Sequence, residues 1–182
     1  APASPSEDGD GLYVVVLSLW GFDLIMSIDP YWYSGLFGGY YVVTSLYTGF
    51  GLVTFLVICA NARGVSRVSA SGIQDVAKLT FAMCVMWMYF FFSQYLIIWG
   101  ANLPEEITWF LERTRGPWGY VSLLLAFGQF VLPFLLLLSR NLKERPALLA
   151  RVAFGVLVMR LIDLIWLIEP NYERPGFPIH WM

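Results

Sequence analysis

Five apolar runs, each close to the length of a membrane-spanning helix, constrain this sequence more than any other feature. They cover Leu12–Ile28, Leu36–Ala60, Leu79–Ala101, Trp118–Leu138 and Leu148–Ile168. A helix needs about 20 apolar residues to cross a hydrocarbon core of about 30 Å, and in lipid only helices and closed barrels satisfy their own backbone. The sequence therefore predicts an all-α, polytopic transmembrane bundle of about five spanning helices.

The shortage of charge supports this prediction. Of the 182 residues, 13% are charged and 58% are hydrophobic, whereas soluble domains carry about 25% charged residues. A net charge of −2 gives no indication of a basic surface that binds nucleic acid. Because the chain has so few charged residues, membrane lipid is its expected surrounding. The two cysteines, Cys59 and Cys84, lie inside apolar runs without metal-ligand spacing, which favours buried thiols.

The chain divides into three parts. Residues 1–11 are polar, acidic and rich in Pro and Gly, and they predict a loop-like lead-in rather than a signal peptide, because they lack a basic region. Residues 12–169 form one transmembrane domain, and residues 170–182 form a short extramembrane tail. Pro104, Glu105 and Glu106 predict a short helix between the third and fourth runs, because proline and acidic residues suit a first helical turn.

Aromatic and basic residues near the ends of the runs predict the placement in the membrane. The aromatic residues indicate an interfacial belt, and they are Tyr31, Trp32, Tyr33, Trp99, Trp109, Trp118, Trp166 and Tyr172. Seven basic residues follow the second and fourth runs: Arg63, Arg67, Lys78, Arg140, Lys143, Arg145 and Arg151. The opposite side carries three: Arg113, Arg115 and Arg174. The positive-inside rule then predicts a cytoplasmic N-terminus and a periplasmic C-terminus.

Three charged residues stand inside the apolar runs. Arg160 and Asp163 are three residues apart, which puts them on one face of a helix. Because each charge near the middle of a bilayer costs about 2.5–3.5 kcal/mol, we expect them to pair and to face the bundle interior. Asp23 has no basic neighbour in sequence, so it needs a partner from another helix, and Arg160 could serve both acids.

Two interpretations of these charges stay open. Carboxylates at Asp23 and Asp163 could change protonation along a hydrated path, which would make them a proton relay. Alternatively, a satisfied ion pair could fix how the helices pack. For Arg160 the structural interpretation is the stronger one, since arginine does not titrate.

Further polar residues are weighed in the same way. Gln94 and Tyr95 in the third run, and Gln129 in the fourth, could hydrate a proton path, although such residues more often make interhelical hydrogen bonds. Asp75 and Lys78, three residues apart at the start of the third helix, could admit protons. A surface ion pair at a helix start is the simpler interpretation of these two.

Redox motifs are missing from the sequence. The single histidine, His180, excludes a haem held by two histidines of this chain. There is no Cys-x-x-Cys-His motif, no iron–sulfur cysteine run and no Gly-rich phosphate loop. We therefore expect no cofactor and no metal on this chain.

Several stretches resemble a known family. IMSIDPYWYSGLFGGYY, DVAKLTFAM, FFFSQYLIIWGANLPEEITWFLER, VSLLLAFGQFVLPFLLLLSR and RLIDLIWLIEP are similar, in this order, to the F subunit (ActF) of bacterial alternative complex III, which is related to NrfD-like membrane proteins. The resemblance covers nearly everything from Leu12 to Pro170 and matches the second half of the family's chain. Its most specific block is SQYLIIWGANLPEE.

The resemblance implies a place in a respiratory complex of the bacterial inner membrane. That complex oxidises a quinol and passes electrons to cytochrome c or to a terminal oxidase. Haem c, iron–sulfur clusters and quinol are expected on partner subunits, namely a multihaem cytochrome c, an iron–sulfur protein and a quinol-binding NrfD-like membrane subunit. The F-type subunit itself is not catalytic, and part of a proton half-channel is ascribed to it.

The chain also departs from the family. Gln129 and Arg160 stand where the family often has histidines, which puts a histidine-based relay in doubt and shifts the weight to Asp23 and Asp163. Arg160 would keep Asp163 ionised, so Asp23 becomes the better candidate proton carrier. The alternatives are a purely structural assembly subunit, a small independent transporter, for which no inverted repeat is evident, and quinone binding by this chain itself.

Overall fold

A computed structural model describes residues 5–29, 32–65, 67–101, 104–143 and 145–172. Within these ranges every regular element is a helix, which confirms the all-α prediction. In chain order the elements are α1 (Pro5–Leu24), η1 (Met26–Ile28), α2 (Phe37–Ala62), α3 (Ala70–Ala101), α4 (Pro104–Thr114), α5 (Pro117–Leu125), η2 (Ala126–Val131), α6 (Leu132–Leu138), α7 (Arg140–Lys143), α8 (Pro146–Ile168) and η3 (Glu169–Asn171). Tyr31 and the tail from residue 173, with Arg174 and His180, lie outside the described residues.

The described part of the chain contains four stretches of helix that are long and apolar enough to cross a membrane. They are Gly11–Ile28, α2, α3 and Pro117–Leu138. The fifth predicted span, α8, has 23 residues, which is about 35 Å at 1.5 Å per residue. Its length therefore suits a span, whereas Arg151, Arg160 and Asp163 make its composition less apolar.

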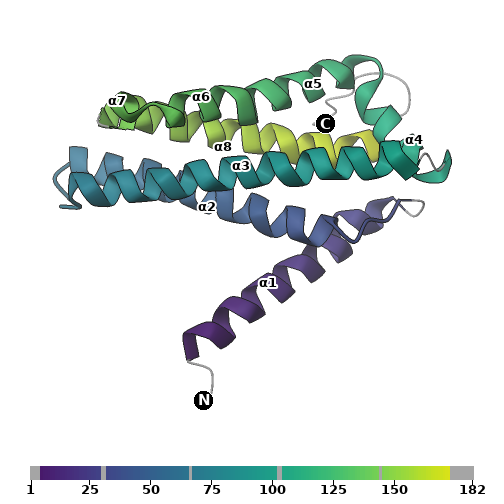
Figure 1. Ribbon diagram of the computed structural model, residues 1–182, viewed down its shortest axis with the longest axis horizontal. Coiled ribbons are helices and arrows are strands. Elements are labelled where there is room, and N and C mark those ends of the chain that lie inside the picture. The colour runs from purple at the N-terminus through teal and green to yellow at the C-terminus, as the bar shows by residue number, and fades with distance from the viewer. Residues whose placement is uncertain (1–4, 30–31, 66, 102–103, 144, 173–182) are drawn as a thin grey trace, which may run out of the picture.

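The helices α2, α3, α8 and the consecutive α5 and α6 lie side by side, whereas α1 diverges from them (Figure 1). The C-terminal end of α2, the N-terminal end of α3 and the helix α7 lie at one end of the bundle, which we call the basic end (Figure 1). At the other end, the aromatic end, lie η1, α4 and η3. The two Lys- and Arg-rich connections therefore share one end, as the charge pattern predicts.

The first helix begins earlier than expected. The loop-like lead-in predicted for residues 1–11 is wrong from Pro5 onward, because α1 starts there. Proline suits the first position of a helix, which explains a start at Pro5. The helix α3 starts at Ala70, five residues before Asp75, which the sequence predicts to lie at the start of this helix.

A π-helical segment, η2, interrupts the span Pro117–Leu138. Pro133 follows two residues later; it has no N–H, and its ring crowds the carbonyl four residues earlier, which is that of Gln129. This carbonyl instead accepts a hydrogen bond from the Tyr47 hydroxyl of α2, at 3.1 Å. A tertiary contact thus satisfies a backbone acceptor that an unbroken α-helix would satisfy internally.

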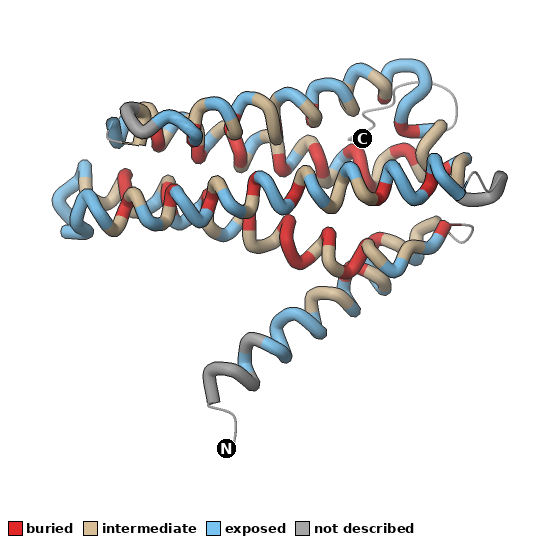
Figure 2. Tube along the Cα trace, viewed as in Figure 1, coloured by how far each residue is buried: buried red, intermediate tan, exposed pale blue. Residues whose placement is uncertain are grey.

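Buried residues lie on the faces that the helices turn toward one another, and the outward faces are exposed (Figure 2). The exposed set includes large apolar side chains such as Leu56, Ile97 and Phe127, which is typical of a surface that faces lipid. Only 6% of the α1 spanning window is buried, against 39% in α2. The first helix therefore adds little to the core.

Four tryptophans of the predicted interfacial belt pack inside the bundle instead. Trp32, Trp109, Trp118 and Trp166 are each at most 6% exposed. The rings of Trp32 and Trp109 stack with 4.1 Å between their centroids, and Trp166 meets Trp109 edge-on at 5.9 Å. Tertiary packing buries these four rings, whereas Trp99 is exposed. Their depth in a membrane stays a prediction.

Candidate functional site

The candidate site is built around an ion pair inside the bundle. Arg160 and Asp163 of α8 are both buried, and the Arg160 Nη1 donates a hydrogen bond to the Asp163 Oδ2. Their i, i+3 spacing brings them together on the inward face of the helix. The predictions that these two charges pair and face the interior are confirmed.

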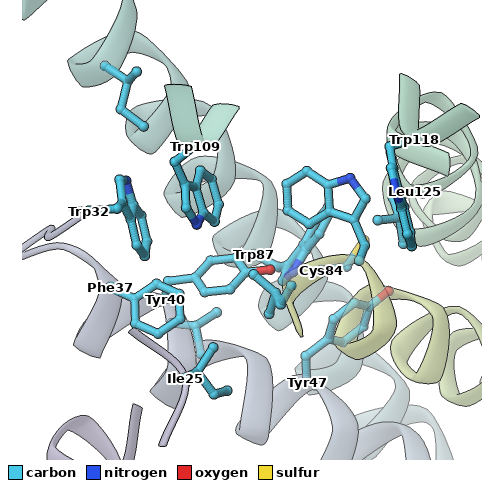
Figure 3. Packing of buried hydrophobic residues seen from close by; sticks show 14 of the residues in the cluster. Ile25, Trp32, Phe37, Tyr40, Tyr47, Cys84, Trp87, Trp109, Trp118 and Leu125 are labelled. Atoms are coloured by element: carbon cyan, nitrogen blue, oxygen red, sulfur yellow. The ribbon is translucent and has the colours of Figure 1, made fainter. Parts of the chain in front are cut away.

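Tyr40 of α2 completes this cluster. Its hydroxyl donates to the Asp163 carboxylate, with distances of 3.1 Å to Oδ2 and 3.3 Å to Oδ1. In Figure 3 the same hydroxyl points toward the Trp87 indole of α3. We call Tyr40, Arg160 and Asp163 the buried triad. It joins α2 to α8 through polar contacts at a place where the surroundings are apolar.

A small cavity lies on the Tyr40 side of the triad. Aromatic rings from the aromatic end line it together with Gln94, whose side chain is buried. The volume of the cavity is ≈ 20 Å³, about enough for one water molecule. The Gln94 Oε1 accepts a hydrogen bond from the Ser34 hydroxyl at 2.9 Å, and its buried Nε2 has no partner among the described residues.

A groove lies on the Arg160 side. It runs between α2 and α8 on the outer surface of the bundle, and it is lined by Tyr41, Ser45, Thr48, Leu157, Arg160, Leu161 and Leu164. The polar side chains of α2 on its wall recur at three- and four-residue steps, so they form one stripe of the helix. The buried triad therefore borders an interior cavity through Tyr40 and a groove between α2 and α8 through Arg160.

Gln129 occupies a separate buried polar position in η2. Its side chain is fully buried, and neither Oε1 nor Nε2 has a hydrogen-bond partner in the part of the chain that the structure describes. The interhelical hydrogen bond predicted for this side chain is therefore wrong within the described residues, and the Gln129 backbone carbonyl instead accepts one from Tyr47. Tyr47 stands two turns beyond Tyr40 on α2, toward the basic end, which is about 10 Å along the helix.

Asp23 does not join the triad. It is exposed on α1, and Arg160 pairs with Asp163, so the expectations that Asp23 turns inward and shares Arg160 are wrong. The reason is the way α1 packs: a Cβ on Gly21 would meet the Tyr41 side chain at 3.0 Å, and a Cβ on Gly38 would meet the Phe22 ring at 2.9 Å. These contacts orient α1 by the Gly21–Phe22 face, and Asp23 projects from another side.

The remaining sequence candidates lie apart from the triad. Asp75 and Lys78 form an exposed ion pair of 2.7 Å near the start of α3, as the simpler interpretation predicts. Tyr95 is exposed, and its ring lies 5.2 Å from that of Phe110 of α4. Neither contributes to the buried triad.

Sequence reasoning missed Tyr40 and Arg113. Tyr40 and Tyr47 stand seven residues apart and are both buried, so a helical repeat of tyrosines on one face of α2 was the available signal. In the sequence, Arg113 stands out only as one of the three basic residues on the less basic side of the predicted membrane span. The sequence offers no sign that its guanidinium is buried.

Arg113 of α4 links this helix to the end of α8 and to η3 at the aromatic end. Its guanidinium donates to the carbonyls of Trp109 and Leu167 at 3.0 and 2.9 Å, and to the Asn171 Oδ1 at 2.9 Å. It also lies 3.8 Å from the centroid of the Trp109 ring. Burial lowers the pKa of Arg113 to about 9, against the opposing influence of Glu112 and Asp29, so the side chain stays charged at neutral pH.

Among the described residues there is no group of three His, Cys, Asp or Glu side chains that could hold a metal ion. Both cysteines are free thiols, and Cys84 is buried as predicted whereas Cys59 is half-buried. Comparison of the sequence with models of protein families and with curated proteins finds no match.

Proposed function

We propose that this chain is a cofactor-free membrane subunit of a quinol-oxidising respiratory complex of the alternative complex III type, and that the buried triad belongs to its proton path. The resemblance around SQYLIIWGANLPEE supports the choice of complex. The observation that carries the proton path is Asp163, a fully buried carboxylate whose neighbours Tyr40 and Arg160 line a cavity and a groove.

The triad has the groups that such a path requires. Tyr40 donates a hydrogen bond to Asp163 from the cavity side, and the cavity has room for about one water beside Gln94. Arg160 reaches the groove on the other side. Because arginine stays protonated, Arg160 would offset the negative charge of Asp163 whenever that carboxylate is ionised, and Asp163 is the group that would carry the proton.

The proposal also includes a location and partners. Placing the basic end on the cytoplasmic side of a bacterial inner membrane puts the N-terminus in the cytoplasm and the C-terminus in the periplasm. A multihaem cytochrome c, an iron–sulfur protein and a quinol-binding NrfD-like subunit would hold haem c, the iron–sulfur clusters and the quinol. Co-purification of those chains with this one supports the assignment, and their absence from a purified complex contradicts it.

The test removes the triad's charges together, so that no buried charge is left alone. In the assembled complex, R160M/D163N is expected to retain quinol oxidation while the number of protons translocated per electron falls. The matched control is D75N/K78Q, which removes the exposed ion pair of the same spacing and is expected to change neither quantity.

Two outcomes favour other functions. Unchanged proton translocation in R160M/D163N, together with weaker assembly of the complex, supports the structural interpretation, in which the ion pair only fixes helix packing. Substrate flux through liposomes that contain this chain alone supports an independent transporter.

A further inference from the structure

A second groove lies between α6 and α8 near the basic end. Its walls are largely apolar, with Leu132 and Leu136 from α6 facing Val152 and Met159 from α8. Its volume is ≈ 320 Å³, which is in the range of small-molecule sites. The groove lies apart from the buried triad, since its lining shares no residue with the cavity beside Tyr40 or with the groove beside Arg160.

Gly155 keeps this groove open. A Cβ built on Gly155 meets no atom within 4 Å, although the residue lies mid-helix and lines the groove. Glycine inside a helix costs about 1 kcal/mol relative to alanine, and helix packing gives no reason for it here. Gly128 on the opposite wall differs, because a Cβ there would meet the Met159 side chain at 2.7 Å.

One basic residue lines the groove, and further basic residues stand near it in the sequence. Arg151 lines the groove and is exposed, with its Nε 3.3 Å from the Ala147 carbonyl. Residues 140–151 contain four basic residues and one acidic residue, which leaves a net charge of four minus one, or +3. Lys143 on α7, another of the four, lies with its ammonium 5.3 Å from the centroid of the Phe81 ring.

We propose that this groove binds an anionic phospholipid, with one acyl chain against Gly155 and the phosphate at Arg151. The apolar walls suit a hydrocarbon chain, and basic pockets between transmembrane helices suit anionic headgroups. Arg151 can follow the apolar wall with its methylenes while its guanidinium reaches the headgroup level. A neutral lipid would gain the apolar contacts alone.

Native mass spectrometry of the purified full chain tests the proposal with phosphatidylglycerol and phosphatidylcholine of identical acyl chains. Phosphatidylglycerol should bind roughly fivefold more tightly, since one basic residue near a membrane surface contributes about 1 kcal/mol toward anionic lipid. Arg151→Gln should remove most of this preference, whereas Arg63→Gln, at the exposed C-cap of α2, should retain it. Equal binding of the two lipids by the unsubstituted chain overturns the proposal.

Filling the groove with a larger side chain tests whether the acyl chain binds against Gly155. Gly155→Leu should weaken the binding of both lipids at least tenfold, and Gly49→Leu, at an exposed α2 position that is equally open around its Cβ, should leave binding unchanged. On the unsubstituted chain, phosphatidylglycerol with a diazirine in its acyl chain should label peptides that contain residues 128–136 and 148–159. Labelling confined to other helices overturns the proposal even if Gly155→Leu fails to fold.

Discussion

At the scale of single residues, the main feature is a pair of opposite charges that is buried in an apolar interior and hydrogen-bonded there. The Arg160–Asp163 pair is buried, and the Tyr40 hydroxyl supplies a further hydrogen bond to the carboxylate. Removing a charge from water costs several kcal/mol, which mutual attraction offsets only when the remaining hydrogen bonds are also made. The cost of burying each of these two charges is therefore offset only while the other charge is present.

This dependence predicts a strong coupling between the two substitutions. Arg160→Met alone leaves Asp163 charged and unpaired, and we expect it to lower the free energy of unfolding by about 3–5 kcal/mol. Adding Asp163→Asn should recover more than half of the loss, because the amide oxygen can still accept from Tyr40. Denaturant unfolding of the four proteins of this double-mutant cycle measures the coupling, and additive effects would show that the charges do not interact.

A second residue-scale prediction concerns Tyr47, whose hydroxyl donates to the Gln129 carbonyl of η2. Tyr47→Phe should lower the free energy of unfolding by about 1–3 kcal/mol, since it leaves a buried carbonyl short of a donor. The Cys84 thiol, whose Sγ lies 3.8 Å from the same oxygen, is only a weak donor. Tyr41→Phe, at a half-buried position of the same helix, is the control and should change stability by less than about 0.5 kcal/mol. Equal effects of the two substitutions would contradict the role assigned to Tyr47.

At the scale of elements, the helices differ in how much of their surface packs against the rest of the bundle. The broken span of α5 and α6 is tied to α2 through the carbonyl that η2 exposes. By contrast, α1 packs on α2 over a short contact and exposes most of its surface. Local stability follows the number of buried contacts, so α1 should open more readily than α3 or α8.

The α1–α2 contact depends on Gly38, where a Cβ would meet Phe22 at 2.9 Å and Ser18 at 3.0 Å. Gly38→Val should cost about 1–3 kcal/mol by overpacking, so amide hydrogen exchange in residues 11–24 should become roughly 5- to 150-fold faster. Gly49→Val, at an open position of the same helix, should leave exchange in α1 unchanged. If both variants accelerate exchange equally, helix propensity rather than the close approach is responsible.

At the scale of the whole molecule, the bundle has two chemically different ends. The basic end contains the α2 C-terminus, the α3 N-terminus and α7, whereas the aromatic end contains the stacked tryptophans and the buried Arg113. Basic connections favour the cytoplasmic side of a membrane, and this asymmetry gives the orientation that we propose.

The orientation predicts which end a membrane-impermeant maleimide can reach. In a Cys59→Ala background, which leaves only the buried Cys84 thiol, Val65→Cys should be labelled in inverted membrane vesicles and protected in spheroplasts. Tyr172→Cys, at an exposed position at the aromatic end, should show the opposite pattern. Labelling of both positions from the same side would contradict the proposed topology.

The sequence by itself determined the helical class, the approximate spans and the common face of Arg160 and Asp163. These features depend on hydropathy and helical periodicity, which are local properties. For the same reason the exposed Asp75–Lys78 pair was predictable, since both side chains belong to one helical turn.

Only the tertiary structure decided which long-range neighbours each polar group has. Nothing local in the sequence placed Tyr40 against Asp163, buried Arg113 beneath Trp109, or left Asp23 exposed on a helix that leans away from the bundle. Helical periodicity gives the face on which a side chain stands, but helix packing selects what that face meets, and in a membrane nearly every face is apolar. The choice of proton-path candidates therefore moved from Asp23 to the buried triad once the packing was known.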